Sequence, residues 1–128
     1  MIEQAIYSRL SGFAGLTALV GDRISHEVTP QDDGYPQVVF NRVSTRRYPA
    51  MGSNAGVATS RVQVNIYGAT ALSAQETAVQ VRAALSRWRG TAGGVTVQAI
   101  FDEAESTDYD ADIQKHRVIL DFMASFEE

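Results

Sequence analysis

The acidic segment 102–112 is the part of the chain whose residue types come closest to a site for chemistry. Its charged side chains are all carboxylates: Asp102, Glu103, Glu105, Asp108, Asp110 and Asp112. The run from Asp108 to Asp112, with an aspartate at every second position, superficially suggests calcium binding. A calcium loop of the EF-hand type, however, needs a glycine at its sixth position and a glutamate at its twelfth, and both are missing here. A metal-dependent enzyme that uses this segment is therefore only a distant alternative.

The other residue types that carry out catalysis lack the neighbours that catalysis needs. The two histidines, His26 and His116, each fall in a predicted strand without a partner at metal-ligand spacing. The glycines of 90–94 are not followed by the Gly-Lys-Ser/Thr of a phosphate-binding loop, and no serine lies in a nucleophile elbow. We therefore predict no catalytic residue, no bound metal and no cofactor.

The composition is that of an ordinary globular domain. With 128 residues, 45% of them hydrophobic, the chain can form one core, and we assign residues 1–128 to a single domain. The absence of cysteine excludes a disulfide scaffold and thiolate metal sites. No apolar run is long enough to span a membrane, and the N-terminus does not resemble a signal peptide. The net charge of -4 argues against a general nucleic-acid-binding protein.

Charges of opposite sign are collected in two separate segments. Between Arg42 and Arg61 the only charged side chains are four arginines, Arg42, Arg46, Arg47 and Arg61, whereas the segment 102–112 carries only carboxylates. Two solvated loops would explain this pattern. Complementary surfaces on neighbouring subunits would explain it as well, because charge sets the specificity and the orientation of protein contacts.

Alternation and helical spacing predict the elements that position these segments. Residues 61–67 alternate between apolar and polar side chains, which is typical of a half-buried strand. Ser73 and Glu76 then form a capping box, and an apolar stripe predicts the main helix at about 73–89. Similar patterns predict an N-terminal helix from Ile2, a helical turn at 15–21, an edge strand at 22–28, and strands at 37–44, 95–101 and 116–126.

The predicted fold class is α+β. It is a mostly antiparallel sheet of four to five strands with the main helix packed on one face and the N-terminal helices beside it. The strands 95–101 and 116–126 are predicted to pair antiparallel. The segment 45–60 has no periodicity and is long for a connection, so we expect an irregular loop; because it joins two strands, a long hairpin is the alternative. Its Arg46, Arg47, Tyr48 and Met51 are of the types enriched at protein contacts.

The ordered set of these local patterns resembles the tail-completion, or tail-terminator, family of long-tailed phages and phage-like particles. The residues that carry the resemblance cover nearly the whole chain: Ile2-Glu-Gln-Ala-Ile-Tyr-Ser-Arg-Leu10, Leu16-Thr-Ala-Leu-Val-Gly-Asp-Arg-Ile24, Tyr35-Pro-Gln-Val-Val-Phe40, Arg61-Val-Gln-Val-Asn-Ile-Tyr67, Ala74-Gln-Glu-Thr-Ala-Val-Gln-Val-Arg-Ala-Ala-Leu85 and His116-Arg-Val-Ile-Leu-Asp-Phe122.

The resemblance implies a structural protein of the virion tail and neck, assembled in the bacterial host cytoplasm. Such proteins form a ring, usually a hexamer, that caps the head-proximal end of the tail tube and ends its polymerisation. The ring then joins the tail to a head-side connector or stopper protein, and DNA passes through its lumen without specific binding. The expected contacts with other subunits or partners are Arg46, Arg47, Tyr48, Met51, Asp108, Tyr109, Asp110 and Asp112. A head-side connector or neck subunit, or a minor tail protein, is the alternative.

Overall fold

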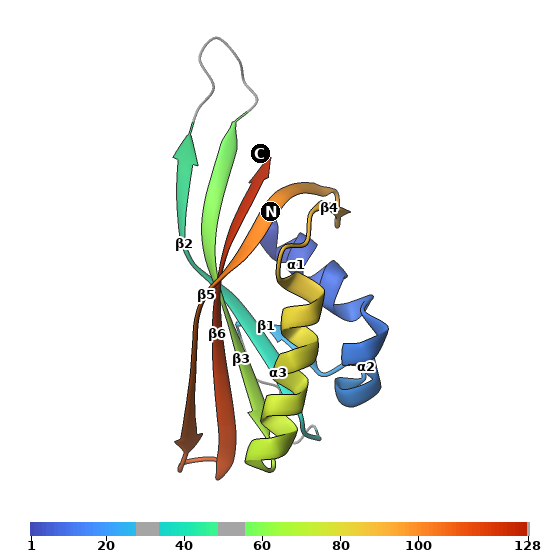
Figure 1. Cartoon of the computed structure of the whole chain (residues 1–128), viewed down its shortest axis with the longest axis vertical. Helices are drawn as coiled ribbons and strands as arrows, with labels where there is room; N and C mark the ends of the chain where they lie inside the picture. The colour runs from blue at the N-terminus through green and yellow to red at the C-terminus, as the bar shows by residue number, and fades with distance from the viewer. Residues whose placement is uncertain (28–33, 49–55, 128) are drawn as a thin grey trace.

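The computed structural model describes residues 1–27, 34–48 and 56–127 of the chain. Three helices lie on one side of a long, twisted sheet (Figure 1). The helices are α1 (Ile2–Ser11), α2 (Ala14–Val20) and α3 (Ala71–Leu85). The strands are β1 (Ile24–His26), β2 (Gln37–Tyr48), β3 (Val57–Gly68), β4 (Gly90–Ala92), β5 (Val95–Asp110) and β6 (Lys115–Glu127).

The sheet has the strand order β1-β2-β3-β6-β5-β4. Only β1 and β2 run parallel, and every other neighbouring pair is antiparallel. The predicted α+β class is therefore confirmed, including the antiparallel pairing of the last two long strands. The described sheet has six strands rather than four to five, because the short β4, directly after α3, adds an edge that no sequence pattern indicated.

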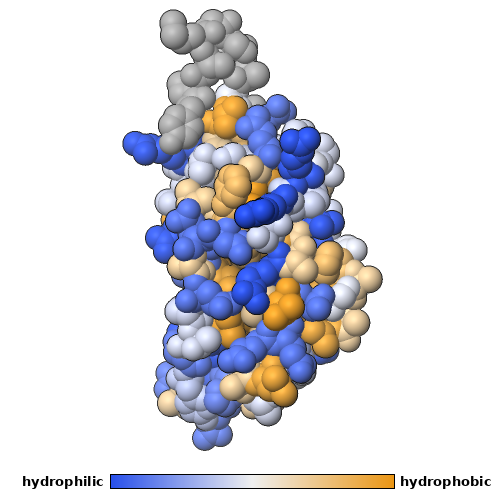
Figure 2. Space-filling model, viewed as in Figure 1, coloured by the Kyte–Doolittle hydropathy of each residue, from blue (hydrophilic) through white to orange (hydrophobic). Residues whose placement is uncertain are grey.

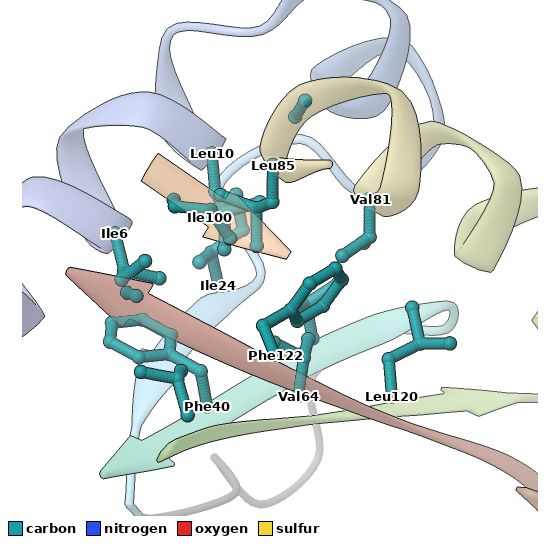
Figure 3. Packing of buried hydrophobic residues seen from close by; sticks show 14 of the residues in the cluster. Ile6, Leu10, Ile24, Phe40, Val64, Val81, Leu85, Ile100, Leu120 and Phe122 are labelled. Carbon is teal, nitrogen blue, oxygen red and sulfur yellow. The ribbon is translucent and has the colours of Figure 1, made fainter. Parts of the chain in front are cut away.

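The centre of the sheet is the pair formed by β3 and β6, which match residue for residue from Val57 opposite Glu127 to Gly68 opposite His116. Their alternating apolar side chains point toward the helices, where Val64, Leu120 and Phe122 are buried. Val81 and Leu85 of α3 and Ile6 and Leu10 of α1 meet them from above (Figure 3). Apolar stripes on one face of each element thus produce one core between the sheet and the helices.

The main helix begins and ends earlier than its sequence pattern suggested. Thr70 is extended, and its hydroxyl accepts a hydrogen bond from the backbone N–H of Ser73 at 3.1 Å. Thr70 is therefore the N-cap, and the capping box predicted for Ser73 and Glu76 is wrong. At the other end Ser86 is extended, so Trp88 lies beyond the helix and packs partly buried against the core.

Two segments that the sequence patterns left irregular belong to long strands. β2 continues to Tyr48 and β3 starts at Val57, so the predicted loop 45–60 is wrong at both ends; Met51 lies outside the described residues. The acidic residues 102–110 belong to β5, so two solvated loops do not describe the charged segments. Pairing with β3 and β6 keeps these segments of β2 and β5 extended. Register shifts at residues 43, 98 and 103 interrupt the alternation of apolar and polar side chains by which a strand is recognised in a sequence.

Both long outer strands are only partly covered by the short edge strands. Among the described residues, β1 pairs with β2 only at 38–40, and β4 pairs with β5 only at 95–97. No described strand covers residues 41–48 of β2 or residues 101–110 of β5 on their outward sides, and the carbonyl of Ile100 in β5 accepts a hydrogen bond from the backbone N–H of Arg87 at 2.7 Å. We call these stretches the β2 outer edge and the β5 outer edge.

Truncation of Phe122 tests the position of the core. The ring of Phe122 is 1% exposed beneath the helices, so we expect Phe122→Ala to lower the free energy of unfolding by about 3–5 kcal/mol in urea denaturation. Phe101 on the neighbouring strand is the matched control, because it is 56% exposed. If Phe101→Ala destabilised the isolated chain as much as Phe122→Ala, the core would be misplaced.

Candidate assembly surfaces

The predicted basic contact residues lie at one end of the molecule. Arg46 pairs with Thr59 and Arg47 with Ala58, close to the end of the β2–β3 ladder at the top of Figure 1. Both arginines are exposed. The backbone of Tyr48 continues the ladder opposite Val57. Because neighbouring residues of a strand point to opposite faces, Arg46 and Arg47 present charge on both faces of this end.

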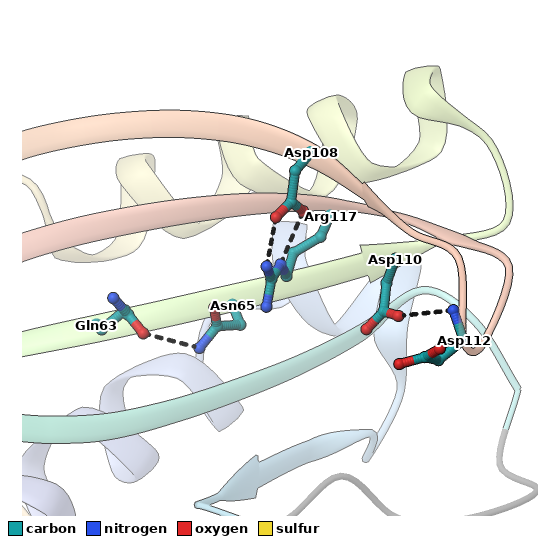
Figure 4. A network of polar contacts seen from close by, with 6 residues as sticks. All are labelled: Gln63, Asn65, Asp108, Asp110, Asp112 and Arg117. Atoms are coloured by element: carbon teal, nitrogen blue, oxygen red, sulfur yellow. Dashed lines mark hydrogen bonds and ion pairs between the residues drawn. The ribbon is translucent and has the colours of Figure 1, made fainter.

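The predicted acidic contact residues lie together at the opposite end, where β5 turns into β6 (Figure 4). The guanidinium of Arg117 donates hydrogen bonds to both carboxylate oxygens of Asp108, with 2.8 Å between Arg117 Nε and Asp108 Oδ1. These hydrogen bonds, together with the charge of Arg117, hold the pKa of Asp108 below its ordinary value and raise the pKa of Arg117. The charge of Asp108 is thus largely balanced inside the chain.

The remaining acidic-end residues build the turn itself. Oδ1 of Asp110 accepts a hydrogen bond from the backbone N–H of Asp112 at 3.1 Å, a local contact typical of aspartate in turns. The ring of Tyr109 meets the His116 ring edge-on at 4.9 Å between centroids, yet Tyr109 stays 52% exposed. Asp108, Tyr109 and Asp112 are therefore exposed to another molecule, whereas Asp110 is only partly exposed.

The basic and the acidic ends cannot meet within one subunit. Arg47 is aligned with Ala58 of β3, whereas Asp108 is aligned through Arg117 with Tyr67 of the same strand. The stretch of β3 between Ala58 and Tyr67 spans roughly 30 Å at the rise of an extended strand. Any contact between the two charged groups has to be made between different molecules.

The face of the sheet that the helices leave uncovered carries a ladder of polar pairs. Thr59 and Ser125 share a hydrogen bond at 3.2 Å, and Arg61 forms an ion pair with Asp121 at 3.3 Å. Farther along β3, the amide of Asn65 donates to Gln63 (Figure 4). The sequence placed Arg61, Gln63 and Asn65 on a polar face, but the register that brings Asp121 and Ser125 to them was not visible in it.

The surface in the view of Figure 1 is mixed, with hydrophobic residues showing in small groups between hydrophilic ones (Figure 2). The two histidines are far apart, His26 stacked on Phe40 with 5.3 Å between ring centroids and His116 beside Tyr109. In residues 1–27, 34–48 and 56–127, no three side chains of His, Asp or Glu gather into a metal-binding group. None of the described helices combines the length and the hydrophobicity needed to cross a membrane.

The ion pair at the acidic end gives a test by titration. We expect the pKa of Asp108, followed by NMR, to lie below 3.8 and to return toward that value in Arg117→Gln, because the charged hydrogen bonds are lost. Any stability from this pair is present above the ordinary carboxyl pKa and is lost as the pH falls through the lower pKa of folded Asp108. Arg89→Gln is the control, because it removes an exposed arginine elsewhere in the chain. If the pKa of Asp108 were the same in Arg117→Gln as in the parent, the pairing of Asp108 with Arg117 would be contradicted.

Comparisons with known proteins agree with this architecture. The family model of "Tail completion protein gp17" matches residues 4–127 of the chain. A chain from the solved structure "Virion of native gene transfer agent (GTA) particle" has the same fold, with a TM-score of 0.76 at 20% sequence identity. That likeness covers 97% of this chain and 92% of the other. A search of curated proteins found no match. Because the family model spans nearly the whole chain, the protein belongs to the tail completion protein gp17 family, a family of structural virion proteins and not of enzymes.

Proposed function

We propose that the chain assembles into a ring that caps the head-proximal end of a tail tube, ends its polymerisation and joins the tail to the head. The match of the tail completion family over residues 4–127 carries this proposal. The shared fold with a chain of a gene transfer agent virion supports the same structural class. The ring number implied by the family resemblance is six.

The elongated shape supports a role between two axial partners. The Arg46–Arg47 end and the Asp108–Asp112 end lie at opposite ends of the long strands and carry opposite charge. If the strands run along the ring axis, one end faces the tail tube protein and the other faces the head-side connector or stopper protein. Opposite charges on the two ends would orient the ring, because each partner would be repelled from the wrong end.

The polar face suits the wall of a channel for DNA. Arg61 is balanced by Asp121 and Arg117 by Asp108, so these two arginines of the helix-free face are already neutralised. Unbalanced arginines would bind phosphates and slow the passage of DNA. The acidic net charge of -4 adds to this effect. We therefore place the helix-free face toward the lumen and the helices outside.

Particles that lack the protein separate this function from its alternatives. Electron microscopy should then show tubes of excessive length or tails that are not joined to heads. Normal tails beside heads that leak DNA would instead identify a head-side connector. Complete, normally joined particles would contradict both functions.

Charge reversal at the basic end tests its part in joining. We expect Arg46→Glu combined with Arg47→Glu to abolish joining of tails to heads or to tubes, because a repulsive end replaces a complementary one. The unfolding curve of the isolated chain should stay close to that of the parent. The matched control is Arg87→Glu with Arg89→Glu, which makes the same change in net charge at two exposed residues next to α3. Normal assembly of the Arg46/Arg47 variant in a complementation assay would rule out this role for the basic end.

A further inference from the structure

The two outer edges of the sheet are suited to each other. We propose that the ring closes by antiparallel pairing of the β2 outer edge of one subunit with the β5 outer edge of the next, which makes one continuous sheet around the ring. The partner at each edge is thus a second copy of this chain. The proposal rests on the ring of the proposed function and names the surface that closes it.

Strand direction permits this arrangement. The strands β2, β3, β6 and β5 alternate in direction, so β2 and β5 run in opposite directions at the two sides of the sheet. A neighbour related by rotation about an axis along the strands therefore places its β2 antiparallel to β5. The contact uses two different patches of each subunit, which is what a closed ring larger than a dimer needs.

The charges favour the unlike pair of edges over the like pairs. The charged residues of the β2 outer edge are Arg42, Arg46 and Arg47, and those of the β5 outer edge are Asp102, Glu103, Glu105, Asp108 and Asp110. Pairing of β5 with β5, or of β2 with β2, would bring like charges together. Repulsion between like charges commonly prevents an edge strand from pairing with the same edge of another copy. Pairing of β2 with β5 brings arginines to carboxylates instead.

The two edges also meet at matching height. Across the sheet, Arg42 is aligned with Val62, Phe122 and finally Asp102. Subunits side by side therefore bring the start of the β2 outer edge next to the start of the β5 outer edge, whereas Arg46 lies at the height of Ala99, outside the β5 outer edge. Glu105 and Asp108 form ion pairs with Arg82 and Arg117, whereas no described side chain pairs with Asp102 or Glu103. Asp102 and Glu103 are therefore the carboxylates available to a neighbour.

Exposed apolar side chains lie at the same height on both edges. Val43, at the β2 register shift, is 49% exposed, and Phe101 on β5 is 56% exposed. Phe101 is aligned through Met123 and Arg61 with Ser44, the residue after Val43. Edge pairing would cover both side chains and would surround them with the charged pairs, as in a protein interface with an apolar centre and a polar rim.

Cysteine crosslinking tests the pairing directly, because the chain contains no cysteine of its own. Val43→Cys and Phe101→Cys are introduced together, and rings formed with tail tube protein are treated with a bifunctional maleimide too short for an intrachain link. Within one subunit the two sites are three strand spacings apart, roughly 14 Å, whereas directly paired strands are about 5 Å apart. We expect a ladder of covalent oligomers up to the ring number on a denaturing gel.

The single variants and the mass of the assembly decide the outcome. Val43→Cys alone and Phe101→Cys alone should give no covalent dimer above background; efficient dimers of either would mean that like edges pair. Rings of normal mass in which the double variant does not crosslink would overturn the edge pairing and leave the proposed function standing. Absence of any ring in the presence of tail tube protein would overturn the proposed function and the edge pairing together.

Charge exchange gives a second readout that a folding defect would not imitate. Asp102→Arg with Glu103→Arg should weaken ring formation more than about tenfold, because arginines would then face arginines. Combination with Arg42→Glu, at the residue aligned with Asp102, should restore it. A combined variant that assembles no better than Asp102→Arg/Glu103→Arg alone would contradict the charge pairing.

Discussion

The side chains that β3 and β6 direct toward α3 have to be removed from water, and most of the remaining structure follows from this burial. Val64, Leu120 and Phe122 are almost fully buried, and α1 and α3 are the elements that cover them. Because the helices occupy that face, the opposite face of the strands has to be polar, and its arginines are balanced by carboxylates such as Asp121. The long central ladder also carries β2 and β5 well beyond their short partners.

In a single molecule, the outer edges of β2 and β5 have backbone N–H and C=O groups that no neighbouring strand pairs with in the described part of the chain. The outward backbone groups of β2 and β5 are of the kind that attract another strand, and each edge is protected by charge of a single sign. That protection acts against identical edges and not against the unlike one. A structural protein whose role is to assemble in one orientation benefits from this difference, because charge selects the neighbour while the backbone supplies the contact.

Local patterns in the sequence were sufficient where the elements are regular. Alternation in residues 61–67 predicted β3, and the stripe through Ala78, Val81 and Leu85 predicted α3. The acidic half of β5 was missed because its side chains do not alternate in polarity, and only pairing with β6 makes it a strand. Asp108, Tyr109, Asp110 and Asp112 could be predicted to lie together in the structure because they lie within five consecutive positions of the sequence. The Arg61–Asp121 pair needed the strand register, which no local pattern encodes.

If this chain forms a ring at the end of a tail tube, the mass of the assembled species reveals the ring. Native mass spectrometry of the chain alone and mixed with tail tube protein reports the number of 13.9 kDa subunits held together. We expect one closed ring, of six subunits by the family resemblance, bound to a tube that no longer elongates. Chains that stay at 13.9 kDa in the presence of tubes, while the tubes continue to grow, would contradict it.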